Sequence, residues 1–234
     1  MATLDRMDVG LRALHLLEGQ RMAQHLFAHV VATEVIKPGR SEEEVDNRIA
    51  LIAREVFGVR AGRVARRFAR SGSNTVVGGQ WPERVIGAQD LVVLDFDSLL
   101  APYETGFART VAIGDDLVRR ALVHDLAVVA QGARDAFRAD DSLTGHELYA
   151  TIRDLAAKAG RSLGGAAHCG RLTGTAPAPR AGATRPEVFI GPDNDRPLRR
   201  TSEEGVRAHW ILQIHLVDEP RGHAAVHTEL LDLC

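Results

Sequence analysis

The sequence predicts an α+β fold in which a unit of two helices and antiparallel strands occurs twice. Two helix-start motifs support this prediction: Ser41 is followed three residues later by Glu44, and Thr144 is followed at the same spacing by Glu147. In such a capping box the hydroxyl and the glutamate satisfy unpaired amides at the helix start. Strands that follow the helices with hairpin-like connections favour an antiparallel sheet over alternating β-α-β units.

The first unit is predicted to contain two helices. Apolar residues recur at helical intervals around Met22, Leu26 and Val30, and the helix that Ser41 opens is expected to end at Gly58. Strands are predicted around residues 74–77, 91–97 and 107–113.

The second unit repeats this order. Helical spacing around Leu122, Leu126 and Val129 precedes the helix that Thr144 opens, which is expected to end at Gly160. Strands are predicted around residues 209–217 and 225–233, and residues 170–200, rich in Gly, Pro and Arg, are predicted to form a loop. We therefore expect one domain over residues 1–234, with two similar halves at roughly 1–115 and 116–234.

Composition excludes several classes of protein. The chain has 234 residues, of which 45% are hydrophobic and 26% charged, as in an ordinary globular protein. A net charge of −2 gives no basic surface for nucleic acid or an anionic membrane. No run approaches the roughly 18 apolar residues of a membrane span. The first residues lack the order of a secretion signal, so a cytoplasmic protein is expected.

Two residue types are unusual in number. Only Lys37 and Lys158 are lysines, so the other basic residues are arginines, a bias more typical of genome composition than of chemistry. The two cysteines, Cys169 and Cys234, cannot form a disulfide framework. Cys169 adjoins His168 and could join a site, but an unreactive small thiol is the favoured interpretation.

Four polar residues far apart in the chain predict a metal site: Asp95, His168, His215 and Glu229. Three of them lie in stretches that resemble buried strands. Asp95 interrupts the apolar run 91–96, and His215 follows the apolar run that starts at Trp210. Carboxylates and imidazoles are costly in such runs unless they have partners, and both are common metal ligands.

Four short segments, taken in order, resemble segments of a known family. They are residues 38–44 (Pro-Gly-Arg-Ser-Glu-Glu-Glu), Gly72-Ser73-Asn74, residues 91–96 and Ala108-Arg109-Thr110. Their order and spacing resemble the pita-bread family of methionine aminopeptidase, aminopeptidase P, prolidase and creatinase. The resemblance covers most of the chain and implies a duplicated α+β catalytic domain with its site on the inner face of the sheet. The separate N-terminal domain of aminopeptidase P and creatinase is expected to be absent.

The resemblance also implies roles for individual residues. Peptidases of the family hold two metal ions with two aspartates, one histidine and two glutamates. Asp95 matches the first aspartate, His168 the histidine and Glu229 the last glutamate. The second aspartate, which bridges the ions, is replaced by Gly106, and the first glutamate by His215.

Further differences concern groups that handle protons. Two substrate-facing histidines of the family correspond to Gly79 and Thr175. Asp97 adds a carboxylate two residues after Asp95, although it could instead cap the hairpin turn. His227 faces the same side as Glu229, so a shifted register could place it in the glutamate position. Glu229 could also be a surface residue of an edge strand.

This inventory predicts a site with one metal ion. Without the bridging aspartate the second ion loses its ligand. Two histidines and a carboxylate resemble the ligands of non-haem iron, and zinc or manganese could bind them too. We therefore expect one divalent ion (Fe, Mn or Zn) at His168, His215 and Glu229, assisted by Asp95. His227 and Asp97 are the catalytic candidates, and Arg109 is expected to hold a carboxylate in place.

The sequence leaves alternatives for function. The main prediction is a metal-dependent, non-peptidase enzyme that acts on a small molecule, with biosynthesis as the role that would fit. One alternative is a hydrolase of a carbon–nitrogen bond, which the creatinase branch cleaves without metal. The other is a non-catalytic binding module. The expected partner is a small molecule, with no nucleic acid or membrane, and a homodimer is the default assembly.

Overall fold

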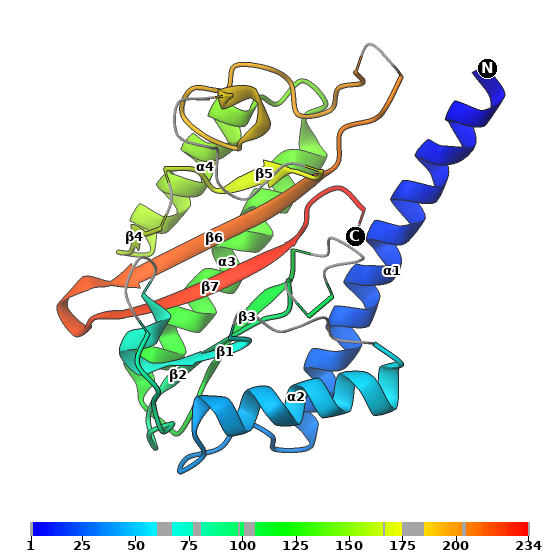
Figure 1. The fold of residues 1–234 in the computed structure, drawn as a ribbon. Helices are drawn as coiled ribbons and strands as arrows, with labels where there is room; N and C mark the ends of the chain where they lie inside the picture. Colours follow the sequence, from blue (N-terminus) through cyan, green and yellow to red (C-terminus); the bar gives the residue numbers. More distant parts are fainter. Residues whose placement is uncertain are drawn as a thin grey trace.

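Helices and one antiparallel sheet form the protein, seen in a computed structural model (Figure 1). The structure describes residues 2–59, 67–76, 81–97, 99–100, 106–165, 167–174, 185–202 and 205–233, with side chains from residue 10 onward. Its elements are α1 (Ala2–Ala32), α2 (Glu42–Phe57), β1 (Ala69–Ser71), η1 (Gly72–Thr75), β2 (Leu91–Asp95), β3 (Ala108–Ala112), α3 (Leu117–Ala139), α4 (Gly145–Lys158), β4 (Ser162–Leu163), β5 (Gly170–Leu172), η3 (Pro186–Val188), β6 (Trp210–Asp218), η4 (Glu219–Arg221) and β7 (His223–Leu230). This architecture confirms the predicted α+β class.

Both predicted capping boxes are present. Ser41 Oγ accepts the Glu44 amide at 3.1 Å while Glu44 Oε2 accepts the Ser41 amide at 2.7 Å. Thr144 and Glu147 make the same pair of bonds at 3.1 and 2.9 Å. Gly58 ends α2 in the left-handed conformation (φ 67°), which glycine adopts without strain. Within the described residues, no helix is long and apolar enough to cross a membrane.

One predicted strand and part of the predicted loop were wrong. The strand expected at residues 74–77 is instead the 3-10 turn η1, and the strand precedes it as β1; residue 77 lies outside the described residues. The cause is the buried carboxylate of Glu42, which accepts bonds from the Ser71 amide and hydroxyl and from Asn74 Nδ2, so that the chain turns around it. Within the stretch predicted as loop, residues 170–172 form β5 because they pair with β6.

The sheet has the strand order β1-β2-β3-β7-β6-β4, with β5 also paired to β6. β1, β2 and β3 form one antiparallel group, and β7, β6, β5 and β4 form the other. The two groups meet where β3 pairs with β7, at the register Ala108↔Thr228. This junction therefore fixes how the two parts of the sheet are aligned.

Threonine side chains extend the junction beyond the backbone pair. The Thr110 hydroxyl donates to the Val226 carbonyl at 3.0 Å and accepts the Val226 amide at 2.7 Å. The Thr75 hydroxyl accepts the Ala224 amide at 2.9 Å. These hydroxyls satisfy backbone groups of β7 that would otherwise be buried without a partner.

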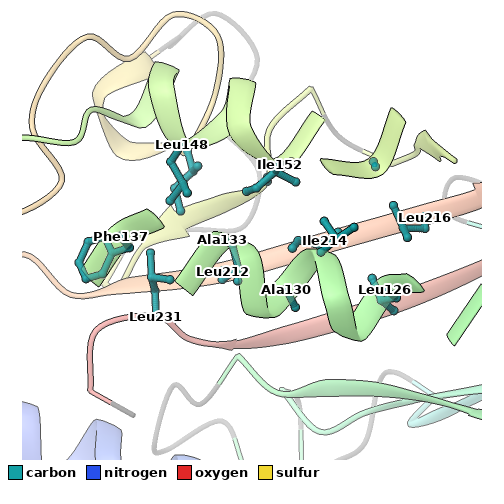
Figure 2. Packing of buried hydrophobic residues seen from close by; sticks show 14 of the residues in the cluster. Leu126, Ala130, Ala133, Phe137, Leu148, Ile152, Leu212, Ile214, Leu216 and Leu231 are labelled. Atoms are coloured by element: carbon teal, nitrogen blue, oxygen red, sulfur yellow. The ribbon is translucent and has the colours of Figure 1, made fainter. Parts of the chain in front are cut away.

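The register assigns each residue of β6 and β7 to one face of the sheet. Leu212, Ile214 and Leu216 pack against α3 and α4, and Figure 2 shows them directed toward α3. We call this side the helix face. Because side chains alternate along a strand, Gln213 and His215 lie on the opposite side, which we call the inner face.

The core on the helix face has two parts. Residues of α3, α4, β6 and β7 form one cluster, in which Ala130 and Ala133 allow α3 to approach the sheet closely (Figure 2). Residues of α1 and α2 form the other, against Leu94 and Phe96. Both helix pairs thus cover the helix face, while on the inner side Leu16 of α1 packs against Ile211 at the start of β6 and Leu230 at the end of β7.

The junction provides a test of stability. Thr110→Val should lower the free energy of unfolding by about 2–4 kcal/mol, because both backbone groups of Val226 lose a partner in a buried position. Urea unfolding followed by circular dichroism measures the change. Thr110→Ser retains the hydroxyl and should lose much less; equal losses in the two variants would contradict a role for these bonds.

A second test uses Asp46, whose Oδ1 accepts the amides of Phe68 and Ala69. Burial raises its pKa from the usual 3.8 to about 7, although these two bonds oppose the shift. The folded protein therefore binds more protons than the unfolded chain between these values, and stability should fall as pH rises from about 4 to about 7.

Asp46→Asn keeps the acceptor and removes the titration. Urea unfolding across pH 4–8 should show a flatter pH dependence than in the unmodified protein, and the variant should be the more stable of the two at pH 8. Asp154→Asn, at an exposed position on α4, should leave the slope unchanged. An unaltered slope in Asp46→Asn would contradict the assignment.

Candidate functional site

A row of paired residues crosses the inner face of the sheet. Asp95 pairs with Ala108, Ala108 with Thr228, and Thr228 with Gln213. Residues paired across antiparallel strands project from the same face, so all four side chains lie on the inner face. His215, two residues after Gln213 on β6, lies there too.

A buried arginine accompanies Asp95 on this face. Arg70 pairs with Val93, is 6% exposed, and places its guanidinium 4.8 Å from the centre of the Trp81 ring. Burial lowers the pKa of Arg70, and the charges of Asp95 and Glu42 oppose that shift. A positive charge therefore stands close to the carboxylate that was predicted as the first metal ligand.

Asp97 lies at the end of β2 and holds the chain there. Its Oδ1 accepts the Gly106 amide at 2.8 Å, and its own amide donates to Asp95 Oδ1 at 3.1 Å. Arg171 of β5 approaches Asp97 Oδ2 at 3.6 Å. These contacts support the structural alternative for Asp97, and its catalytic role stays a prediction.

Two histidines meet near the inner face, His215 from β6 and His168 from the segment before β5. Burial lowers the pKa of His215 to about 4, reinforced by the charge of Arg70 and by His168. Burial, then Arg171, also lowers the pKa of His168, whose ring stacks on Phe189 with centroids 4.3 Å apart. Among the described residues, neither Nδ1 atom has a hydrogen-bond partner.

A pocket of about 460 Å³ opens beside His168. Such a volume is typical of a site for a small molecule. Its lining is mainly apolar, with charges from an arginine and an aspartate: Ala167, His168, Arg185, Pro186, Phe189, Gly191, Pro192 and Asp193.

Glu229 lies on the other side of the sheet. It pairs with Leu212, whose side chain belongs to the core on the helix face. Its carboxylate forms ion pairs with Arg109 of β3 and Arg134 of α3, and the residue is 3% exposed. The expectation that Arg109 holds a carboxylate is confirmed.

His227 shares this position on the helix face. It pairs with Ile214, and its Nε2 lies 3.1 Å from Glu229 Oε2. Burial, then the charges of Arg109 and Arg134, lower its pKa well below the usual range for histidine. His227 is therefore a buried neutral imidazole in a cluster of ion pairs, away from His215.

The structure does not bring the predicted ligands of the single ion together. His215 is on the inner face, whereas Glu229 is on the helix face, so these two residues cannot bind the same ion. The alternative register, with His227 in the place of Glu229, would not bring a ligand to the inner face either, because residues two apart on a strand share a face. The inner-face positions of β7 are held by Val226 and Thr228, neither of which is a carboxylate.

Gly106 shows why the bridging aspartate is missing. Its φ of +50° is in the left-handed region, which side chains other than glycine rarely adopt. A Cβ built on Gly106 would lie 2.6 Å from Ile211 Cγ2. Ile211 therefore fills the space that a side chain at this position would need.

The donor set does not fit the metal sites that were expected. Across the described ranges, no group of three or more His, Cys, Asp or Glu side chains is placed to hold an ion. Gly79 and Thr175, the two predicted differences in proton handling, lie outside those ranges. Cys169 is buried, and burial raises its pKa to about 12, which agrees with the unreactive thiol expected beside His168.

The comparison with known families gives the class of the protein. The sequence profile of metallopeptidase family M24 matches residues 15–200, and the chain therefore belongs to this family. No curated protein sequence matches the chain significantly.

Solved structures show the same fold. A dipeptidase from Pyrococcus horikoshii matches with a TM-score of 0.68 and 17% identity over 94% of this chain and 56% of its own. An X-Pro aminopeptidase from Thermotoga maritima matches with a TM-score of 0.68 and 18% identity over 98% and 61%. A methionine aminopeptidase from Rickettsia prowazekii has a TM-score of 0.60 and 12% identity, covering 94% and 91%. The pita-bread fold is confirmed, and this chain spans little more than half of the dipeptidase.

The position of Glu229 leads to a prediction about stability. Glu229→Gln should destabilise the protein by about 3–5 kcal/mol, because it leaves the charges of Arg109 and Arg134 without their anion in a buried place. Urea unfolding measures this loss. Glu55→Gln, an exposed glutamate beside Arg54, should change stability by less than about 1 kcal/mol. A Glu229→Gln protein as stable as the unmodified chain would argue against this assignment.

Proposed function

We propose that this member of family M24 hydrolyses a carbon–nitrogen bond of a small, peptide-like molecule without a metal ion. His168 and His215 are the groups that handle protons. The observation that supports this most is the distribution of charge on the inner face: its carboxylates have arginines beside them, while two imidazoles are left with an unpaired nitrogen among the described residues.

The arginines argue against a divalent ion next to the carboxylates. A guanidinium beside a carboxylate already supplies the positive charge that a metal ion would bring. Arg70 has this relation to Asp95, and Arg171 to Asp97. A family site with two ions also needs a bridging carboxylate, for which Gly106 and Ile211 leave no space.

The two histidines have the chemistry that hydrolysis needs. A neutral imidazole offers one donor and one acceptor, so it can take a proton from water and return it to a leaving nitrogen. His215 is fixed in a strand, and His168 adjoins the pocket of about 460 Å³. A substrate in that pocket would lie next to one imidazole and near the second.

The substrate class follows from the similar structures. They include a dipeptidase and an X-Pro aminopeptidase, which are enzymes that act on peptide bonds. Because these structures share the fold at low sequence identity, they support only the general class of substrate for this chain. A short peptide, or a small amide related to it, is the proposed substrate.

A metal-dependent enzyme is the second candidate. The observation in its favour is again the pair of unpaired Nδ1 atoms, since imidazole nitrogen is a good ligand for zinc, iron and manganese. On this candidate His168 and His215 would bind the ion, and water or substrate would complete its coordination. Glu229 takes no part in it.

The proposal is tested by hydrolysis of Ala-Pro and Gly-Pro with and without chelator. Product should form in the presence of EDTA, and His215→Asn should lower kcat/KM by about 100-fold or more, because it removes proton transfer. His227→Asn is the matched control, since His227 lies on the helix face; it should retain activity once its folded fraction is accounted for.

Other outcomes identify the alternatives. Activity that needs added manganese or cobalt and is lost in His215→Asn supports the metal-dependent enzyme and contradicts metal-free hydrolysis. The absence of turnover, combined with saturable quenching of Trp81 fluorescence by the dipeptides, supports a binding module, because Trp81 lies over Arg70 of the inner face.

A further inference from the structure

A second pocket, of about 530 Å³, adjoins the pocket beside His168, because Arg185 lines both. It is formed by Arg12 of α1, the end of β5, and residues within 185–202 and 206–209. Five arginines line it, and we call it the arginine pocket: Arg12, Arg185, Arg196, Arg200 and Arg207. Neither Asp95 nor His215 belongs to it.

The described lining of the arginine pocket is strongly positive. Its one carboxylate is that of Glu187, which Arg185 Nε contacts at 3.0 Å. Glu203 and Glu204 follow Ser202 in the sequence but lie outside the described residues. The whole chain carries a net charge of −2, so this local excess of positive charge is opposite in sign to that of the molecule.

Two of the arginines are held in position by neutral partners. Arg12 Nη2 donates to Thr173 Oγ1 at 2.9 Å. Arg200 donates to the carbonyls of Pro197 and Glu187 and lies 5.0 Å above the Trp210 ring. Hydrogen bonds to neutral oxygens and contact with an aromatic ring hold a guanidinium in place without cancelling its charge.

Two others are held less tightly: the charge of Arg196 helps to lower the pKa of Glu187, but neither Arg196 nor Arg207 forms an ion pair with a described carboxylate. No side-chain hydrogen bond or ion pair with the described residues is recorded for Arg196 or Arg207, although both line the pocket. Burial and the nearby charge of Arg196 lower the pKa of Arg200, which shows that like charges have been gathered here. Arg196 and Arg207 are exposed, so their donors are open to an anionic ligand.

Arginine is frequent throughout this chain, so five of them in one pocket do not by themselves indicate a ligand. Several arginines elsewhere are paired with carboxylates: Arg54 contacts Glu55, Arg161 contacts Asp125, and Arg109 contacts Glu229. The arginine pocket differs because its described lining gathers five arginines around one carboxylate.

We propose that the arginine pocket binds a small molecule that carries phosphate groups, such as a diphosphate or a phosphate ester. A guanidinium group can donate two parallel hydrogen bonds to the oxygens of one phosphate. The hydroxyls of Thr201 and Ser202 supply further donors at the lining. Arg185 lines both this pocket and the one beside His168, so the bound anion would lie next to the proposed substrate pocket. The inference does not depend on the proposed hydrolysis.

Isothermal titration calorimetry with inorganic pyrophosphate tests the proposal, with citrate as a polyanion of carboxylates. The variant is Arg196→Gln combined with Arg207→Gln. The control is Arg54→Gln combined with Arg153→Gln, which removes the same charge from exposed positions on α2 and α4. Pyrophosphate should bind the unmodified protein. Its Kd should rise at least 10-fold in the pocket variant and stay within twofold of the unmodified value in the control.

Three results would overturn the inference. One is that pyrophosphate fails to bind the unmodified protein at low salt. Another is equal loss of binding in the pocket variant and the control, which would indicate an unspecific charge effect. The third is citrate binding as tight as pyrophosphate, which would contradict the phosphate class. Comparison of the circular dichroism spectra of both variants checks that they are folded.

Discussion

The junction between β3 and β7 determines which side chains of the last strand face the inner side of the sheet. One backbone pair, Ala108↔Thr228, and the two hydrogen bonds of Thr110 with Val226 set the register of β7. A shift by one residue would exchange the two faces of the strand. In the observed register Thr228 faces the inner side and Glu229 faces the helices, so the last strand gives the inner face a hydroxyl in place of a carboxylate.

Each face of the sheet consequently has its own polar cluster. On the helix face, Glu229 joins β7 to β3 and α3 through two arginines, which makes it a stabilising residue of the core. On the inner face, Arg70 lies beside Asp95, and burial lowers the pKa of both His168 and His215. The chain belongs to a family of metallopeptidases. The inner face of its sheet nevertheless carries arginine and imidazole groups.

Part of this could be predicted from the sequence. The two capping boxes are local signals, and both were read correctly; Asp95 interrupts an apolar run and does lie in a strand facing the site. The face of Glu229 could not be predicted, because β7 is apolar on both sides from Ala224 to Val226 and shows no alternation. Contacts distant in sequence, such as Arg134 with Glu229 and Ile211 with Gly106, required the fold. The equivalence of the two halves stays a prediction.

The most direct test of the account is the metal content of the purified protein. The chain should be loaded with iron, manganese or zinc, desalted and measured by plasma mass spectrometry, together with His215→Ala. Both proteins should retain far less than one ion per chain, because the guanidinium of Arg70 lies near Asp95 and the position of Gly106 has no space for a bridging carboxylate. One ion per chain, retained by the unmodified protein and lost in His215→Ala, would contradict hydrolysis without a metal.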